Sequence, residues 1–274
     1  MKIILLFLIT LNIFAKIPYQ VLESKHNKAV KLWEEGKNQE AFVIFRENKA
    51  ENYHASIFYL GLYYLYGFNT VKVSYDKAFR YIDEASNAGY VDATLQKAIL
   101  YYYGLGTIRD KNIAKKVLGS ISQYIKLLPP KSQSYLLILN RFRFNTLKHR
   151  RKALKKMIRK FNNLDHRLIK VNQIFFYRTF RKYFKMNKIN RKLLNSEVKK
   201  GNSEAQALHY EYYQDTKKSS IEILLSAGKQ GDLNSQFNLY LFYKRIRDKK
   251  NKLKWLKLAA KNGDKTAKKI LKYK

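Results

Sequence analysis

A helix with small residues at fixed positions, within residues 55–67, constrains the fold of this chain more than any other feature. Ala55, Leu60, Gly61 and Tyr64 fall on one face of a helix with 3.6 residues per turn. Because Gly61 has no Cβ, a neighbouring helix can approach closely at that point. Gly67 suits the left-handed C-terminus of a helix, so we predict that this helix ends there.

A second helix is predicted to follow after a loop. Ser74 is a favourable N-cap, and Ala78, Ile82 and Ala85 form an apolar stripe on the helix that it starts. Gly89 is expected to end this helix. Residues 55–89 therefore predict a helix-turn-helix hairpin whose apolar face has to be covered by a neighbouring hairpin.

Parts of this hairpin recur near the C-terminus. Gly201, Gly231 and Gly263 follow one another at intervals of 30 and 32 residues, and each precedes a small residue by four positions. Repeats of this length stack so that each unit buries the apolar stripe of its neighbour.

The recurrence predicts an all-α solenoid. Clear repeats are expected at 53–128 and 201–274, where Asp110 is a candidate N-cap and the last helix of the first stretch is expected to reach Leu128. The chain length then allows about seven helix-turn-helix hairpins over residues 16–274. Residues 265–274 are expected to form a polar capping helix.

Residues 55–89 resemble the Sel-1-like repeat, a family of helical hairpins related to tetratricopeptide repeats. The family pattern is A-x4-L-G-x2-Y-x2-G, then D-x2-K-A, then A-A-x3-G. The residues that match it are Ala55, Leu60, Gly61, Tyr64, Gly67, Lys77, Ala78, Ala85 and Gly89. Ser74 and Ser86 depart from it, because Asp and Ala are usual there. The resemblance implies a right-handed superhelix whose concave face holds a protein or peptide.

Cysteine content separates this chain from one subgroup of that family. The cysteine-rich bacterial members staple each hairpin with a Cys pair, and some are described as β-lactamases. This chain has no Cys at all. A β-lactamase or peptidoglycan-related hydrolase is therefore an alternative function that rests on the resemblance alone.

Residues 1–15 form a mostly apolar run with one Lys near its start. The run is shorter than the about 20 residues that span a bilayer, and it is typical of a secretory signal peptide with cleavage after Ala15. A buried N-terminal helix or an uncleaved anchor is the alternative. No Cys follows the run, which argues against a lipoprotein, and no later stretch is apolar enough for a transmembrane helix. We expect a periplasmic or secreted protein.

Basic residues are concentrated in the middle of the chain. The net charge is +36, and residues 131–200 contain 22 basic and 2 acidic residues. Such a block attracts anionic lipid, polysaccharide or acidic protein, and the alternative is a solvated face with a compositional bias towards Lys. Nucleic acid is the weakest candidate, because no recognition motif is present and export would separate the two. The residues to test for polyanion binding are Lys148, Arg150, Arg151, Lys155, Lys156, Arg159, Arg178, Arg181 and Lys182.

The architecture of this basic block has two interpretations. Its apolar runs keep helical spacing, so residues 131–200 are interpreted as two diverged hairpins that continue the solenoid. The alternative is an inserted helical domain.

Motifs for catalysis or metal binding are weak. The five His residues show no metal-binding spacing. The S-x-x-K pattern of penicillin-interacting serine enzymes starts at Ser74, Ser196 and Ser226, but its companion motifs are missing. We therefore expect no catalytic residue, no metal and no cofactor.

The function that these patterns favour is a monomeric, exported scaffold in the bacterial cell envelope. Its partner would be a protein or peptide on the concave face. The alternatives are the hydrolase named above and the binding of anionic lipid or polysaccharide surfaces.

Overall fold

The computed structural model describes residues 17–121, 127–129, 132, 134–135, 166–180, 188–213 and 218–272. These residues form thirteen helices and no strand, which confirms the predicted all-α fold. The predicted signal peptide at 1–15 lies outside them. In chain order the helices are α2 (Tyr19–Glu35), α3 (Asn38–Ala50), α4 (His54–Tyr66), α5 (Tyr75–Asn87), α6 (Val91–Tyr103), α7 (Lys111–Gly119), α11 (Arg167–Phe180), α12 (Lys188–Lys199), α13 (Ser203–Tyr213), α14 (Lys218–Lys229), α15 (Leu233–Arg245), α16 (Lys249–Lys261) and α17 (Lys265–Lys272).

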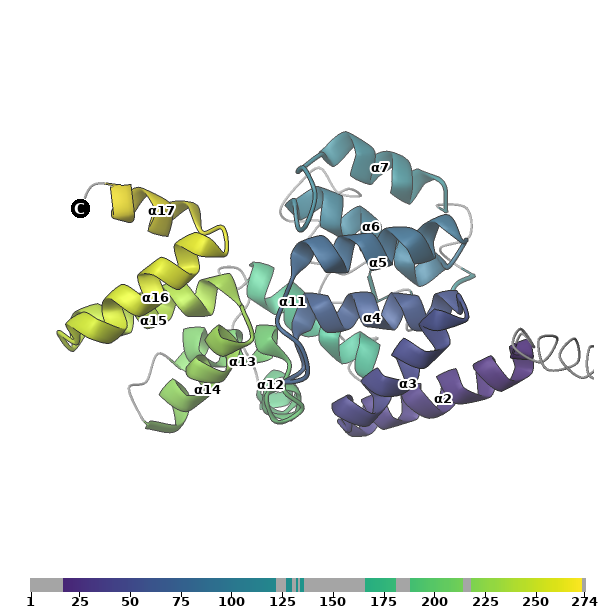
Figure 1. The fold of residues 1–274 in the computed structure, drawn as a ribbon, viewed down its shortest axis with the longest axis horizontal. Coiled ribbons are helices and arrows are strands. Elements are labelled where there is room, and N and C mark those ends of the chain that lie inside the picture. Colours follow the sequence, from purple (N-terminus) through teal and green to yellow (C-terminus); the bar gives the residue numbers. More distant parts are fainter. Residues whose placement is uncertain are drawn as a thin grey trace, which may run out of the picture.

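Two stacks of helices make up the solenoid (Figure 1). We call α2–α7 the N-terminal arm and α12–α17 the C-terminal arm. Within each arm, every helix packs against the next one in the chain. The described residues contain five hairpins (α2/α3, α4/α5, α6/α7, α13/α14 and α15/α16), and α17 covers the last of them. The two hairpins that the sequence predicts at 131–200 lie largely outside the described residues, which include α11, α12 and a few short segments of that stretch.

The hairpin α4/α5 forms where the small-residue pattern predicted it. α4 ends at Gly67, whose φ of 75° lies in the region that favours glycine. The Ser74 hydroxyl accepts a hydrogen bond from the amide of Lys77 and caps α5. Ala78, Ile82 and Ala85 form the buried stripe of α5. The sequence predictions for these positions are confirmed.

Gly61 is the point of closest approach between α4 and α5. A Cβ at Gly61 would lie 2.6 Å from Cγ1 of Ile82. Gly61→Ala is therefore expected to lower the free energy of unfolding by about 1–3 kcal/mol through overpacking. Urea denaturation followed by far-UV circular dichroism measures this loss. Gly119→Ala is the matched control, because a Cβ there meets nothing within 4 Å. Equal stability of the two variants would contradict the close approach.

The start of α7 was predicted correctly and its end was not. The Asp110 carboxylate accepts hydrogen bonds from the amides of Asn112 and Ile113, as expected of an N-cap. The helix was expected to reach Leu128, but it ends at Gly119. The hydroxyl of Ser120 donates to the carbonyl of Val117 at 2.8 Å. This local bond competes with continuation of the helix.

The loop between α4 and α5, residues 67–74, joins the two arms. The amide of Asn69 donates to Oε1 of Gln230 at 2.7 Å, and the amide of Val73 donates to the carbonyl of Gln230 at 2.5 Å. Gly201 has a φ of 76°, and a Cβ there would lie 2.6 Å from the side-chain nitrogen of Asn69. The turns that precede α13 and α15 therefore pack directly on a loop of the N-terminal arm.

Helix α11 is buried on all sides along most of its length. Side chains around its whole circumference, including Leu168, Val171, Ile174 and Phe176, belong to the main hydrophobic core. The polar side chains of Asn172 and Gln173 are buried as well, so the helix lies inside the protein. α11 contacts the first helices of three hairpins: its Arg167 lies on the Trp33 ring of α2, Phe175 packs on a ring of α6, and Arg178 pairs with α13. α11 thus covers the face that the first helices of the hairpins form in the N-terminal arm (Figure 1). We call this face the first-helix face.

Candidate functional site

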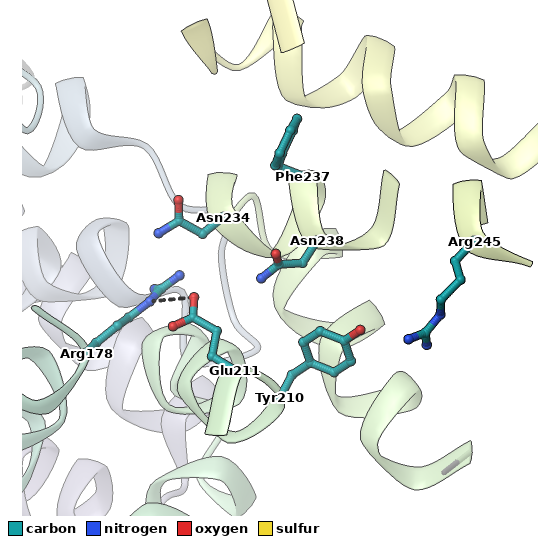
Figure 2. Close-up of a pocket in the computed structure, with 7 residues that line it drawn as sticks. All are labelled: Arg178, Tyr210, Glu211, Asn234, Phe237, Asn238 and Arg245. Atoms are coloured by element: carbon teal, nitrogen blue, oxygen red, sulfur yellow. Dashed lines mark ion pairs between the residues drawn. The ribbon is translucent and has the colours of Figure 1, made fainter. Parts of the chain in front are cut away.

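A pocket of about 450 Å³ opens in the C-terminal arm, between the first helices α13 and α15 (Figure 2). Residues 234, 237, 238 and 245 follow helical spacing, so one face of α15 forms most of the wall. α13 contributes the opposite wall, and the C-terminal half of α11 closes one end. The lining residues are Arg178, Tyr210, Glu211, Asn234, Phe237, Asn238 and Arg245.

Arg178 anchors the closed end of the pocket through three carboxylates. Its guanidinium donates hydrogen bonds to both oxygens of Asp232, at 2.8 and 3.0 Å, and to Oε2 of Glu204. Nε of Arg178 also lies 3.8 Å from Oε1 of Glu211, the pair marked in Figure 2. The side chain of Arg178 is only 8% exposed. A bidentate, buried pair of this kind fixes both position and orientation.

Asp232 has a second role at the start of α15. Its Oδ1 accepts a hydrogen bond from the amide of Ser235 at 2.7 Å, so the same carboxylate caps the helix. The start of α15 is therefore held against α11 and α13. This arrangement orients the pocket face of α15 before any ligand arrives.

Burial and the charges of this cluster shift the pKa values of Arg178, Glu204 and Asp232. Burial acts to lower the pKa of Arg178, but Asp232, Glu204 and Glu211 outweigh it and hold that pKa well above its usual range. Burial raises the pKa of Glu204, an effect that Arg178 opposes and Asp232 reinforces. Burial also acts to raise the pKa of Asp232, but Arg178 and the hydrogen bonds from Ser235 lower it below its ordinary value.

The pocket offers chemistry for recognition. Asn234 and Asn238 carry amide donors and acceptors, and the rings of Tyr210 and Phe237 provide apolar surface (Figure 2). Arg245 lies at the end away from Arg178, so a cation and an acidic cluster stand at opposite ends. Amide groups beside aromatic rings suit the backbone and side chains of a peptide.

The predicted polyanion-binding residues are only partly within the described residues. Arg178 is the member that the structure places, and it faces carboxylates of its own chain. Its role in binding a polyanion stays a prediction. The other predicted residues lie outside the described part of the chain: Lys148, Arg150, Arg151, Lys155, Lys156, Arg159, Arg181 and Lys182.

The pocket residues of α13 and α15 were not predicted from the sequence. One signal was present, because Asn234 and Asn238 are four residues apart on the first helix of a repeat. The scarcity of acids was another, since Glu204, Glu211 and Asp232 are three of only 20 acidic residues. Neither signal distinguishes a pocket from an ordinary surface.

The S-x-x-K serines occupy ordinary structural positions. Ser74 is the N-cap of α5, and Nζ of Lys77 stands over the ring of Tyr64. The hydroxyl of Ser226 bonds to Oδ1 of Asn69 at the junction of the arms. Ser196 is half-buried within α12. Among the residues described, no group of His, Asp and Glu could hold a metal ion, and no helix is long and apolar enough to cross a membrane.

Comparison with known proteins gives two similar structures. No protein-family model matches the chain, and no curated protein does. A Sel1 repeat protein from Oxalobacter formigenes is 19% identical, with 86% of this chain and 99% of that chain covered at a TM-score of 0.39. A protective antigen of uropathogenic Escherichia coli strains, which displays the SLR fold, is 19% identical at a TM-score of 0.40. Both are Sel-1-like repeat proteins.

The second match covers 90% of this chain and 55% of the antigen, so the chain spans about half the length of that protein. Both structures carry the repeat that residues 55–89 resemble.

Proposed function

We propose that this protein is a helical-repeat scaffold that holds a protein or peptide segment in the pocket between α13 and α15. The observation that carries this proposal is that the first-helix face is covered in one arm and open in the other. α11 covers that face in the N-terminal arm, whereas the described residues leave an open pocket in the C-terminal arm. Helical-repeat proteins use this kind of surface to bind extended partners.

The chemistry of the pocket supports a polypeptide ligand. Asn234 and Asn238 can each donate to a carbonyl and accept from an amide of an extended chain. Tyr210 and Phe237 can cover an apolar side chain of the partner. The fixed start of α15, which Asp232 and Arg178 hold, reduces the entropy that the pocket loses on binding.

The proposed location is the bacterial cell envelope or the medium. The apolar run at 1–15 supports export, since it has the composition of a signal peptide. The absence of Cys is compatible with an oxidising compartment, because no free thiol would be at risk there.

Selection of peptides from a random displayed library against the full chain tests the proposed function. Peptides that bind the pocket are expected to bind Asn234→Ala/Asn238→Ala at least about tenfold more weakly, because paired backbone hydrogen bonds are lost. Asn27→Ala/Asn112→Ala is the matched control, since both asparagines are exposed and lie on α2 and α7, which do not line the pocket. If no peptide is enriched, or if both double variants bind equally well, the proposal fails.

A further inference from the structure

A second pocket lies in the N-terminal arm and is lined by α3, α4 and α5. It has a volume of about 270 Å³. Phe42 and Leu60 line its apolar part, Tyr64 and Tyr81 supply aromatic rings, and Arg46 is one of its cations. No residue of the pocket between α13 and α15 takes part, so this second pocket is independent of the proposed function.

The aromatic rings of this pocket are ordered by one another. The rings of Tyr64 and Tyr81 stack with centroids 5.5 Å apart and planes 16° from parallel. Phe42 meets Tyr64 edge-on, with centroids 6.5 Å apart. Nζ of Lys49 stands 5.5 Å from the centre of the Tyr81 ring, and Nζ of Lys77 stands 5.2 Å from that of Tyr64. The ammonium groups thus lie on ring faces, which attract cations.

No carboxylate in the described part of the chain neutralises the cations around this pocket. Among the described residues, no carboxylate forms an ion pair with Arg46, Lys49, Lys77 or Arg80. In contrast, the buried Arg167 and Arg178 are both paired with carboxylates. Positive groups that lie close together repel one another, and a bound anion would relieve that repulsion.

The electrostatic surroundings of Tyr81 agree with this placement. Burial raises the pKa of Tyr81, and Tyr64 and Glu84 add to the increase. Arg80 and Arg46 act in the opposite direction, and Arg46 lines the same pocket as Tyr81. Glu84 is thus one carboxylate near Tyr81, whereas the positive groups are two guanidinium groups and the ammonium of Lys49.

We propose that this pocket binds an aromatic anion, a planar ring that bears a phosphate, sulfate or carboxylate. The ring would lie against the aromatic wall of Phe42, Tyr64 and Tyr81. The anionic group would lie between Arg46 and Lys49. A guanidinium matches two oxygens of such a group at once. The volume is just below the about 300 Å³ at which pockets for drug-sized ligands begin, so the ligand is a single ring and not a larger molecule.

Calorimetric titration of the full chain with phenyl phosphate tests this inference. Inorganic phosphate carries only the anionic half of the probe, and phenol carries only the ring. Phenyl phosphate is expected to bind at least about tenfold more tightly than either, because both halves of the pocket contribute. Inorganic phosphate that binds as tightly as phenyl phosphate would overturn the proposal, and so would the absence of binding by phenyl phosphate.

Two variants show whether the site is the pocket or the general charge of the protein. Arg46→Gln/Lys49→Gln is expected to weaken the binding of phenyl phosphate by a factor of at least about ten. Lys257→Gln/Lys261→Gln removes the same charge from exposed positions on α16 and is expected to bind as the unaltered protein does. Equal losses in both variants would assign the binding to net charge and overturn the site.

A change in the ring wall provides a separate readout. Tyr81→Leu keeps a good helix former at a half-buried position. Tyr81→Leu is expected to weaken the binding of phenyl phosphate. The binding of inorganic phosphate, which is already weaker, is expected to stay unchanged. Equal weakening of both probes would contradict a ring-binding wall. Far-UV circular dichroism verifies that each variant is folded.

Discussion

Arg167→Met is expected to lower the free energy of unfolding by about 3–5 kcal/mol, because it leaves a buried carboxylate without its cation. Arg167 is 1% exposed and Glu197 is fully buried, with Nε of Arg167 3.3 Å from Oε2 of Glu197. The guanidinium also donates to Oδ1 of Asn38 at 2.7 Å, to the carbonyl of Lys200 at 3.1 Å and to the carbonyl of Trp33. One side chain of α11 therefore binds both arms.

Urea denaturation at neutral pH measures the effect of Arg167→Met. Arg191→Met is the control, because it makes the same substitution at an exposed position of α12 and is expected to change stability by less than about 0.5 kcal/mol. Arg167→Met/Glu197→Leu removes the orphaned charge as well and is expected to recover part of the loss. If Arg167→Met is no less stable than Arg191→Met, α11 does not hold the arms in the way described.

Arg178→Met is expected to destabilise the protein by about 3–5 kcal/mol at neutral pH, since three carboxylates then share a site with no cation. Arg178 is the partner of Asp232 and Glu204 and lies near Glu211. Without the guanidinium, repulsion among these carboxylates adds to the cost of burial. The capping of α15 by Asp232 is expected to weaken with them.

The loss caused by Arg178→Met depends on pH, and its sign follows from the pKa shifts. In the unaltered protein the pKa of Asp232 is lowered, so its contribution to stability is present at neutral pH and is lost as the pH falls through that lowered pKa. In the variant, Asp232 and Glu204 lose the guanidinium that acts to lower their pKa values, so the folded state takes up protons as the pH falls. The difference between the two proteins is therefore expected to shrink between neutral and mildly acidic pH.

Denaturation at several pH values measures this difference. Arg245→Met is the control, because Arg245 lines the same pocket at an exposed position and forms no ion pair with any described carboxylate. A loss for Arg178→Met that is equal at neutral and acidic pH would contradict the proposed role of the carboxylates.

The sequence predicted local structure well where one residue decides it. Gly61 and Gly67 were predicted from the absence of a side chain, and Ser74 and Asp110 from their capping oxygens. Each of these features acts within one or two helical turns. The stacking of hairpins followed from their apolar stripes, because each stripe needs a neighbour.

The position of α11 could not be predicted in the same way. Its apolar residues indicate a helix, but they do not specify which surface the helix covers. Contacts such as Arg167 with Trp33, or Asn69 with Gln230, join residues more than a hundred positions apart and leave no periodic signal. The pocket between α13 and α15 also depends on the position of α11, since Arg178 closes one end of it. For that reason the sequence predicted a binding role for the basic residues as a group, but not for the residues that line the pocket between α13 and α15.

The insertion of α11 changes how this repeat protein acquires its structure. In a simple array, each unit is stabilised by its immediate neighbours, and the array can grow from one end. Here the first three hairpins end at residue 119. The helix that covers their first-helix face, α11, begins only at residue 167. Until α11 docks, Trp33 and Tyr103 of the N-terminal arm lack the contacts that Arg167 and Phe175 make with them. The last steps of folding are therefore long-range, and such steps are slow and prone to aggregation compared with growth by adjacent units.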